Sequence, residues 1–123
     1  MKNTLHLNLR KQWFEMIFLG IKKEEYREMS NYWCSRLGHS YDNESSNWID
    51  GIWYGPHKCF DTITFSNGYS RDRPRFEIEF KGIEIREGNP EWGAEPGKKY
   101  FVLKIGEILS SLNCDEFILK NIE

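Results

Sequence analysis

Short segments with an apolar residue at every second position recur along this chain and limit what it can fold into. Residues 5–9, 61–65 and 76–80 all have this period. Because the side chains of a strand point alternately to its two faces, each segment predicts a strand with one buried face. Further strands are expected at residues 83–85 and 100–105.

Two other segments have the spacing of a helix. Residues 11–19 contain apolar pairs four positions apart, and Gly20 follows where glycine commonly ends a helix. Ser30 is expected to cap a second helix over residues 32–37, which Gly38 then ends. Strands separated by turn residues, with helices concentrated near the start, predict an α+β domain or a small barrel.

The rest of the chain is expected to connect these elements. Residues 39–58 are polar and irregular, and a loop of that length is usually a functional lid or a mobile segment. Residues 88–98 predict a second loop, and the apolar residues between 108 and 119 are expected to pack as a closing helix or short strand. The length is that of one domain, so residues 1–123 are expected to form a single one.

Composition and charge narrow the class of partner. Aromatic residues make up 15% of the chain, so a substantial core is possible. The 17 Lys and Arg and 19 Asp and Glu give a net charge of −2, which argues against a protein that coats DNA non-specifically through many phosphate contacts. The same composition does not exclude a local basic cleft on an otherwise acidic protein. Such a cleft would suit a short single strand, a nucleotide or another small anion.

Cysteine usage and the lack of long apolar runs lead us to expect a cytoplasmic protein. Cys34, Cys59 and Cys114 are odd in number and form no C-x-x-C, so we expect reduced thiols. No apolar segment resembles a signal peptide or approaches the roughly 20 residues that a membrane helix needs.

Metal binding is not expected. The spacing of Cys34, His39, His57 and Cys59 matches no common zinc pattern. His6 lies on the polar side of the first predicted strand and is expected to be a surface residue. We therefore expect neither a metal nor another cofactor.

The most charged segment is residues 22–29, which we expect to be extended. In an extended segment, Lys23, Glu25 and Arg27 share one face, and the opposite face also carries a base and an acid. On such a face the Glu25 carboxylate could hold either cation in place. The alternative is an ordinary solvated surface, whose ion pairs contribute about 0–1 kcal/mol each.

The same segment has a chemical interpretation. If it begins as a tight turn, Lys22 and Glu25 converge, and a Lys beside a Glu in a half-buried cleft can act as an acid–base pair. The Arg27 guanidinium is a planar fork that suits phosphate or carboxylate. These features predict a site for an anionic ligand.

Residues 20–27, Gly-Ile-Lys-Lys-Glu-Glu-Tyr-Arg, hold every fixed position of the pattern G-x-K-x-x-E-x-R and in this resemble the ASCH family. The pattern follows a predicted strand and helix, as it does in that family. Other segments resemble a bacterial and phage branch of the family, at residues 65–69, 73–74, 91–93 and 100–102. The resemblance implies a PUA-like mixed β-barrel with flanking helices, whose basic cleft binds RNA or a nucleotide-type ligand through Lys22 and Arg27.

One branch of the family, resembled more distantly, consists of acetylcytidine amidohydrolases that use a Lys and a Thr of the same octet and a distal Glu. Lys22 occupies the Lys position, but Glu25 stands where that branch has Thr, so attack by a Thr hydroxyl is not available. Hydrolysis of a modified nucleoside, with Lys22 as base or electrostatic anchor and Glu25 as acid–base partner, is the second hypothesis. A protein-interaction module with a vestigial cleft is the third.

Two loops add candidate ligand-binding residues. Arg71 and Arg73 suit phosphate contacts, and Tyr69 beside them suits stacking on a base, although a solvated hairpin loop is the alternative. Trp92 is a second stacking candidate, and Glu91 would accept hydrogen bonds from base amines. Further aromatic residues are expected in loops, with core packing as the alternative: Trp48, Trp53 and Tyr54.

Overall fold

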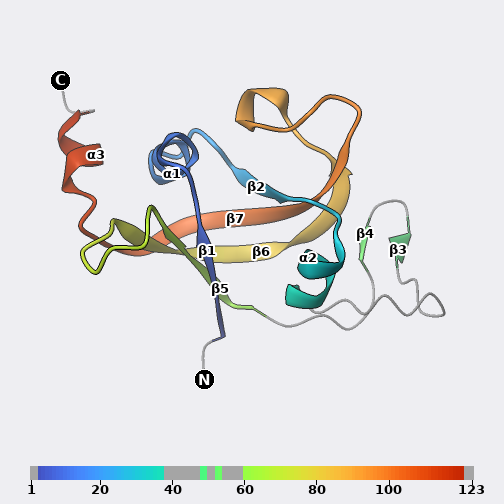
Figure 1. Cartoon of the computed structure of the whole chain (residues 1–123), viewed down its shortest axis with the longest axis horizontal. Coiled ribbons are helices and arrows are strands. Elements are labelled where there is room, and N and C mark those ends of the chain that lie inside the picture. The colour runs from blue at the N-terminus through green and yellow to red at the C-terminus, as the bar shows by residue number, and fades with distance from the viewer. Residues whose placement is uncertain (1–2, 38–47, 50–51, 54–59, 121–123) are drawn as a thin grey trace. The chain divides into compact units, whose positions relative to one another are not determined.

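The computed structural model shows an α+β fold with a mixed sheet (Figure 1). It describes residues 3–37, 48–49, 52–53 and 60–120. Within those residues, no helix is both long enough and apolar enough to cross a membrane. The combination of this sheet with short helices confirms the α+β class predicted from the sequence.

The chain divides into two compact units, each assembled from segments that are distant in the sequence. Unit 1 comprises residues 1–23, 60–81 and 105–123. Unit 2 comprises residues 24–59 and 82–104. Two long strands, β6 (Arg75–Glu87) and β7 (Lys99–Leu112), pair with each other and contribute residues to both units.

The sheet of unit 1 has one apolar and one polar face, as the alternating residues predicted. β1 (Thr4–Asn8) runs parallel to β5 (Thr62–Ser66), and β5 runs antiparallel to β6. In this register Leu7 lies opposite Phe65, and Phe65 lies opposite Phe76. Apolar side chains of all three strands therefore share one face.

Aromatic side chains join that apolar face to two helices. α1 (Lys11–Phe18) places the ring of Phe14 4.8 Å from the ring of Phe76 and 5.2 Å from that of Phe117, between centroids. Phe117 belongs to α3 (Asp115–Lys120), and all three rings are buried. Burying a ring of this size stabilises a fold by about 1.5–3 kcal/mol, so these three rings help to hold unit 1 together.

Local capping sets the ends of the first two helices. Gly20 has a φ of 78°, a conformation that glycine adopts easily, and α1 ends just before it as predicted. α2 (Asn31–Arg36) begins after Ser30, whose Oγ accepts a hydrogen bond from the Trp33 backbone N–H at 3.3 Å. The predicted cap is therefore confirmed, while Gly38 lies outside the described residues.

Unit 2 is organised around the antiparallel pair of β2 (Glu24–Arg27) and β7. Tyr100 and Val102 of β7 are buried together with Ala94, and Tyr26 of β2 packs against this cluster. The extended structure predicted after the first helix is confirmed for the residues of β2. The loop that follows β6 contains a 3₁₀ turn, η2 (Pro90–Trp92).

Trp48 and Trp53 were expected in a loop, and this expectation is wrong. They lie opposite each other in the short strands β3 (Trp48–Ile49) and β4 (Ile52–Trp53). Strands of two residues are too short to show a period in the sequence, so only the cross-strand pairing defines them. Tyr54 and the other residues of the expected 39–58 loop lie outside the described residues.

The apolar tail forms two different elements. Residues 108–112 extend β7, and α3 follows after a turn. Ile108, Leu109 and Leu112 are 37%, 52% and 49% exposed, so they do not belong to the core, whereas Phe117 is buried. Because residues 106–112 are exposed on both faces, they have no apolar alternation from which this part of the strand could be predicted.

Candidate functional site

Lys22, the first charged residue of the G-x-K-x-x-E-x-R pattern, is buried in unit 1. The turn after α1 positions it, since the backbone N–H groups of Ile21 and Lys22 donate to the Met16 carbonyl at 2.9 and 3.0 Å. Lys22 is only 2% exposed, and its Nζ lies 5.3 Å from the centre of the Trp13 ring. This cation–π contact offsets part of the cost of burying an ammonium group.

Glu25 and Arg27, the other two charged residues of the pattern, pair with each other in unit 2. Arg27 Nη2 donates to Glu25 Oε2 at 2.8 Å. The guanidinium carbon lies 4.9 Å from the centre of the Trp33 ring of α2. The two side chains are 8% and 18% exposed, respectively. A carboxylate and an indole ring therefore hold the Arg27 guanidinium in one orientation.

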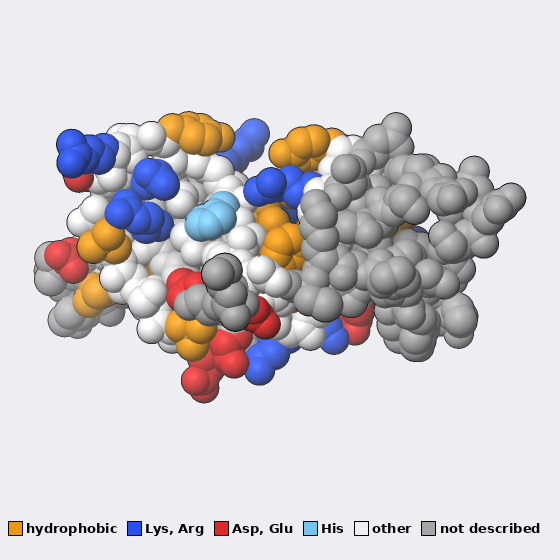
Figure 2. All heavy atoms as spheres, turned by 90° about the horizontal axis from the view of Figure 1, so that it is seen from below, with side chains coloured by type: hydrophobic (Ala, Val, Ile, Leu, Met, Phe, Trp, Pro, Cys, Tyr) orange, Lys and Arg blue, Asp and Glu red, His pale blue; other side chains and the backbone are white. Residues whose placement is uncertain are grey.

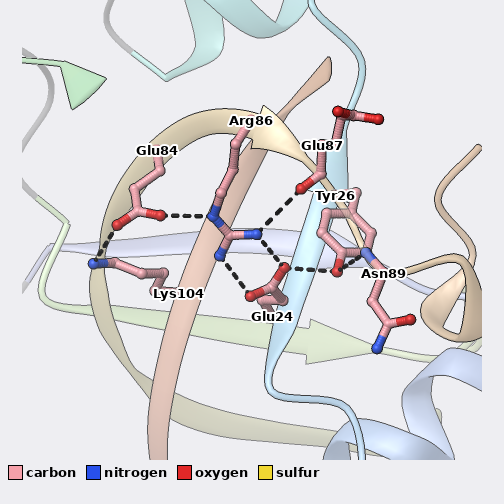
Figure 3. A network of polar contacts seen from close by, with 7 residues as sticks. All are labelled: Glu24, Tyr26, Glu84, Arg86, Glu87, Asn89 and Lys104. Atoms are coloured by element: carbon pink, nitrogen blue, oxygen red, sulfur yellow. Dashed lines mark hydrogen bonds and ion pairs between the residues drawn. The ribbon is translucent and has the colours of Figure 1, made fainter. Parts of the chain in front are cut away.

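The opposite face of β2 carries a network of polar contacts (Figure 3). Arg86 donates to both oxygens of Glu24, from Nη2 to Oε1 at 2.7 Å and from Nη1 to Oε2 at 2.9 Å. Its Nε donates to Glu84 Oε2 at 2.7 Å. The Tyr26 hydroxyl donates to Glu24 Oε2 at 2.6 Å and accepts from the Asn89 backbone N–H at 2.8 Å.

These contacts shift the pKa values of the network. Burial by itself raises the pKa of Glu24, but hydrogen bonds from Arg86 and Tyr26 outweigh it and hold that pKa below its usual range. Hydrogen bonds from Arg86 and from Lys104, whose Nζ lies 3.0 Å from Glu84 Oε1, lower the pKa of Glu84. The network is thus satisfied by its own members, and we assign Glu24 and Tyr26 a structural role.

The loop between β5 and β6 presents Tyr69, Arg71 and Arg73 in unit 1. Tyr69 is 89% exposed, and Arg71 is exposed as well. Arg73 is half-buried, and its Nη1 donates to the Ser70 carbonyl at 3.1 Å. An aromatic ring and two guanidinium groups therefore lie on a short surface loop, as the sequence predicted.

Hydrogen bonds from neighbouring elements fix this loop. At its start, Asn8 Nδ2 of β1 donates to the Gly68 carbonyl at 2.7 Å. At its end, Arg75 Nη1 donates to the Arg73 carbonyl at 3.1 Å, and Asn113 Nδ2 donates to the Asp72 carbonyl at 3.1 Å. A loop held in this way loses less conformational entropy when it binds a ligand.

The remaining candidates lie in η2 of unit 2. Glu91 is exposed, and Trp92 is half-buried. The structure brings Glu25 and Arg27 into direct contact. The other candidates divide between the two units: Lys22, Tyr69, Arg71 and Arg73 belong to unit 1, and Glu91 and Trp92 to unit 2.

A pocket on the polar face of the unit 1 sheet was not predicted. Its volume is about 370 Å³. Figure 2 shows a face of the molecule on which Lys and Arg side chains (blue) gather to the left of a histidine (pale blue), with Asp and Glu side chains (red) below it. Four strands supply the polar lining of the pocket: Thr4 and His6 of β1, Thr64 of β5, Arg75 and Glu77 of β6, and Ser110 and Ser111 of β7.

Strand register explains how these residues meet. His6 lies opposite Thr64, and Thr64 lies opposite Glu77, so the three side chains form a row across three strands. Glu77 Oε2 accepts hydrogen bonds from Thr62 Oγ1 at 2.8 Å and from Thr4 Oγ1 at 3.4 Å. The polar residues at every second position were visible in the sequence, but only the register shows that they share one hollow.

Comparisons of the chain with protein-family models, with curated proteins and with solved structures give no match. In the part of the chain that the structure describes, no group of His, Cys, Asp and Glu side chains is arranged to hold a metal ion. The function must therefore be inferred from the residues and their contacts.

Proposed function

We propose that this protein is a PUA-like domain of the ASCH type that binds single-stranded RNA or a nucleotide. The observation that carries the proposal is the withdrawal from water of all three charged residues of the G-x-K-x-x-E-x-R pattern. Lys22 and Glu25 are buried, and the Arg27 side chain is 18% exposed. The alternative interpretation of residues 20–27, a solvated surface, would leave these charged side chains exposed.

Removing these charged groups from water costs free energy, so their presence in buried positions needs an explanation. Lys and Glu are almost never fully buried unless they are paired, and Glu25 is paired with Arg27. Replacing a buried ion pair by apolar residues of similar volume is often neutral or even stabilising. Charged residues kept at three positions of one octet therefore favour a binding role over a purely structural one.

The chemistry of the pattern suits a phosphate-bearing ligand. Lys22 places a positive charge in unit 1, and in unit 2 Arg27 is paired with Glu25. Arg27 offers a planar fork for phosphate, and its pairing with Glu25 and its contact with Trp33 keep that fork oriented. Lys22, which is almost completely buried, contributes mainly through its charge, since water screens a buried charge less than an exposed one.

The β5–β6 loop of unit 1 carries by itself groups that suit a single strand. Base stacking on an exposed aromatic ring contributes about 1–3 kcal/mol per base, and Tyr69 is 89% exposed. Arg71 extends the positive charge of the same loop. The overall charge of −2 restricts such binding to local contacts, which favours a short single strand over long duplex DNA.

Fluorescence anisotropy with labelled single-stranded RNAs, measured at low and at high salt, tests this function. We expect binding that weakens as salt increases, because ions condensed on the strand are released on binding. Arg71→Gln should weaken binding and reduce the salt dependence, whereas Lys99→Gln, which removes one exposed charge outside the candidate set, should change neither. Absence of salt-sensitive binding to every strand tested would contradict the proposal.

A further inference from the structure

The pocket on the polar face of unit 1 has a lining that the G-x-K-x-x-E-x-R pattern does not explain. We propose that it binds the ribose 5′-phosphate part of a nucleotide. The choice of a nucleotide, rather than another hydroxylated phosphate, rests on the function proposed above. The pocket itself is an observation on unit 1 alone.

One part of the pocket is suited to the phosphate. Arg75 lines it, and in the described part of the chain the hydrogen bonds of its guanidinium all come from Nη1, to the Arg71 and Arg73 carbonyls at 3.5 and 3.1 Å. A guanidinium has five N–H donors in a planar fork, so donors remain for two phosphate oxygens. His6 also lines the pocket and can donate an imidazole N–H.

Another part is suited to the sugar. Glu77 is held by the hydroxyl of Thr62, at 2.8 Å, and a carboxylate in a fixed position is a common acceptor for ribose hydroxyls. Thr64, Ser110 and Ser111 add hydroxyl groups that can both donate and accept. A ligand with hydroxyls on one side and a phosphate on the other therefore matches this lining.

The size of the pocket selects against larger ligands. A volume of about 370 Å³ is near the lower end of the range for small-molecule sites. It suits a sugar phosphate with its base extending outward, and it is too small for several nucleotides of a strand. The β5–β6 loop begins and ends beside the pocket, since Ser66 and Arg75 are opposite each other in the register.

Isothermal titration calorimetry with adenosine 5′-monophosphate, ribose 5-phosphate, adenosine and inorganic phosphate tests the assignment. We expect adenosine 5′-monophosphate and ribose 5-phosphate to bind. Adenosine and inorganic phosphate should bind much more weakly, because each of these two offers only half of the required groups. Ser111→Phe should abolish binding by filling the pocket. Glu107→Phe adds the same bulk at an exposed position of β7 outside the pocket lining and should leave binding unchanged.

His6→Ala provides a second variant, at an exposed residue that lines the pocket. We expect it to weaken ribose 5-phosphate binding by about tenfold, the effect of one hydrogen bond to a charged group. Thermal melting checks that each variant is folded. No binding of either phosphorylated ligand, or binding that Ser111→Phe leaves intact, would overturn the assignment.

The same proteins, titrated into labelled RNA, separate this proposal from the function on which it rests. RNA binding without any binding of ribose 5-phosphate rejects the pocket and retains the proposed function. Binding of ribose 5-phosphate without RNA binding supports the pocket and rejects a role in binding strands. Tighter binding of 5′-phosphorylated RNA than of 5′-hydroxyl RNA would support the pocket as a site for the end of a strand. Equal affinities for the two RNAs, together with binding of adenosine 5′-monophosphate, would support it as a site for the free nucleotide.

Discussion

Glu24 and Glu25 are adjacent in the sequence, yet they point to opposite faces of β2 and pair with different arginines. Glu24 accepts two hydrogen bonds from Arg86, which comes from the distant strand β6. Glu25 accepts one from Arg27, two residues along the same strand. One face of β2 therefore stabilises unit 2. In our proposal, the opposite face of the strand takes part in binding.

The network around Glu24 should make unit 2 sensitive to acid. Contacts in the folded protein lower the pKa values of Glu24 and Glu84. The stabilisation that these two carboxylates give is therefore complete above their unfolded pKa of about 4.3, and it is lost as pH falls through their lower folded pKa values. Glu24→Gln should reduce the free energy of unfolding by about 1–2 kcal/mol at pH 7 and by less at pH 3. Urea unfolding at the two pH values measures this, and an equal loss at both would contradict it.

Gly88 should not tolerate a larger side chain. A Cβ atom at this position would lie 2.6 Å from the Tyr26 ring and 2.7 Å from the Ala94 Cβ. Because both residues belong to the packed cluster of unit 2, we expect Gly88→Ala to destabilise the protein by about 1–3 kcal/mol. Thermal unfolding compares it with Glu87→Ala, the exposed neighbour. Equal melting temperatures for the two variants would contradict this prediction, because the cluster would then accommodate the added methyl group without loss of stability.

The thiol of Cys114 should be unreactive in the folded protein. Burial raises its pKa, which lowers the fraction of the nucleophilic thiolate, and the thiol donates to backbone carbonyls of Arg75 and Leu112 at 3.4 Å. We expect iodoacetamide at neutral pH to leave it unmodified in the native protein and to modify it after unfolding in urea. Peptide mass mapping gives the result for this cysteine separately. Rapid modification of the native protein would contradict the buried position of Cys114.

Acylated cytidine should not be hydrolysed. Glu25 stands where the resembling amidohydrolases have Thr, and its carboxylate is engaged by Arg27 at 2.8 Å. Chromatography of acetylcytidine after incubation with the protein measures turnover. Turnover that Lys22→Ala abolishes in a folded protein would favour the enzymatic hypothesis over the binding one.

Much of the fold could be predicted because the relevant information is local. The alternation of Leu5, Leu7 and Leu9 and the glycine after α1 each depend on a few neighbouring residues. The capping by Ser30 is equally local. β7 was predicted too short because residues beyond 105 are exposed and show no pattern.

The candidate site was predictable only where it is local. Glu25 and Arg27 are two residues apart on one strand, so their shared face followed from the strand period alone. The partner of Glu24 could not be predicted, because Arg86 is 62 residues away. His6 was expected to be an ordinary surface residue, since its neighbours across the sheet, Thr64 and Glu77, depend on strand register.

The role of Arg27 in binding is tested most directly by comparing two variants that each keep the positive charge of an arginine but lose its planar fork. Arg27→Lys changes the face of β2 assigned to binding, and Arg86→Lys changes the structural face. Anisotropy with a single-stranded RNA should show an affinity about tenfold lower for Arg27→Lys and unchanged for Arg86→Lys, with both proteins folded. Equal affinities for the two variants and the native protein would contradict the account.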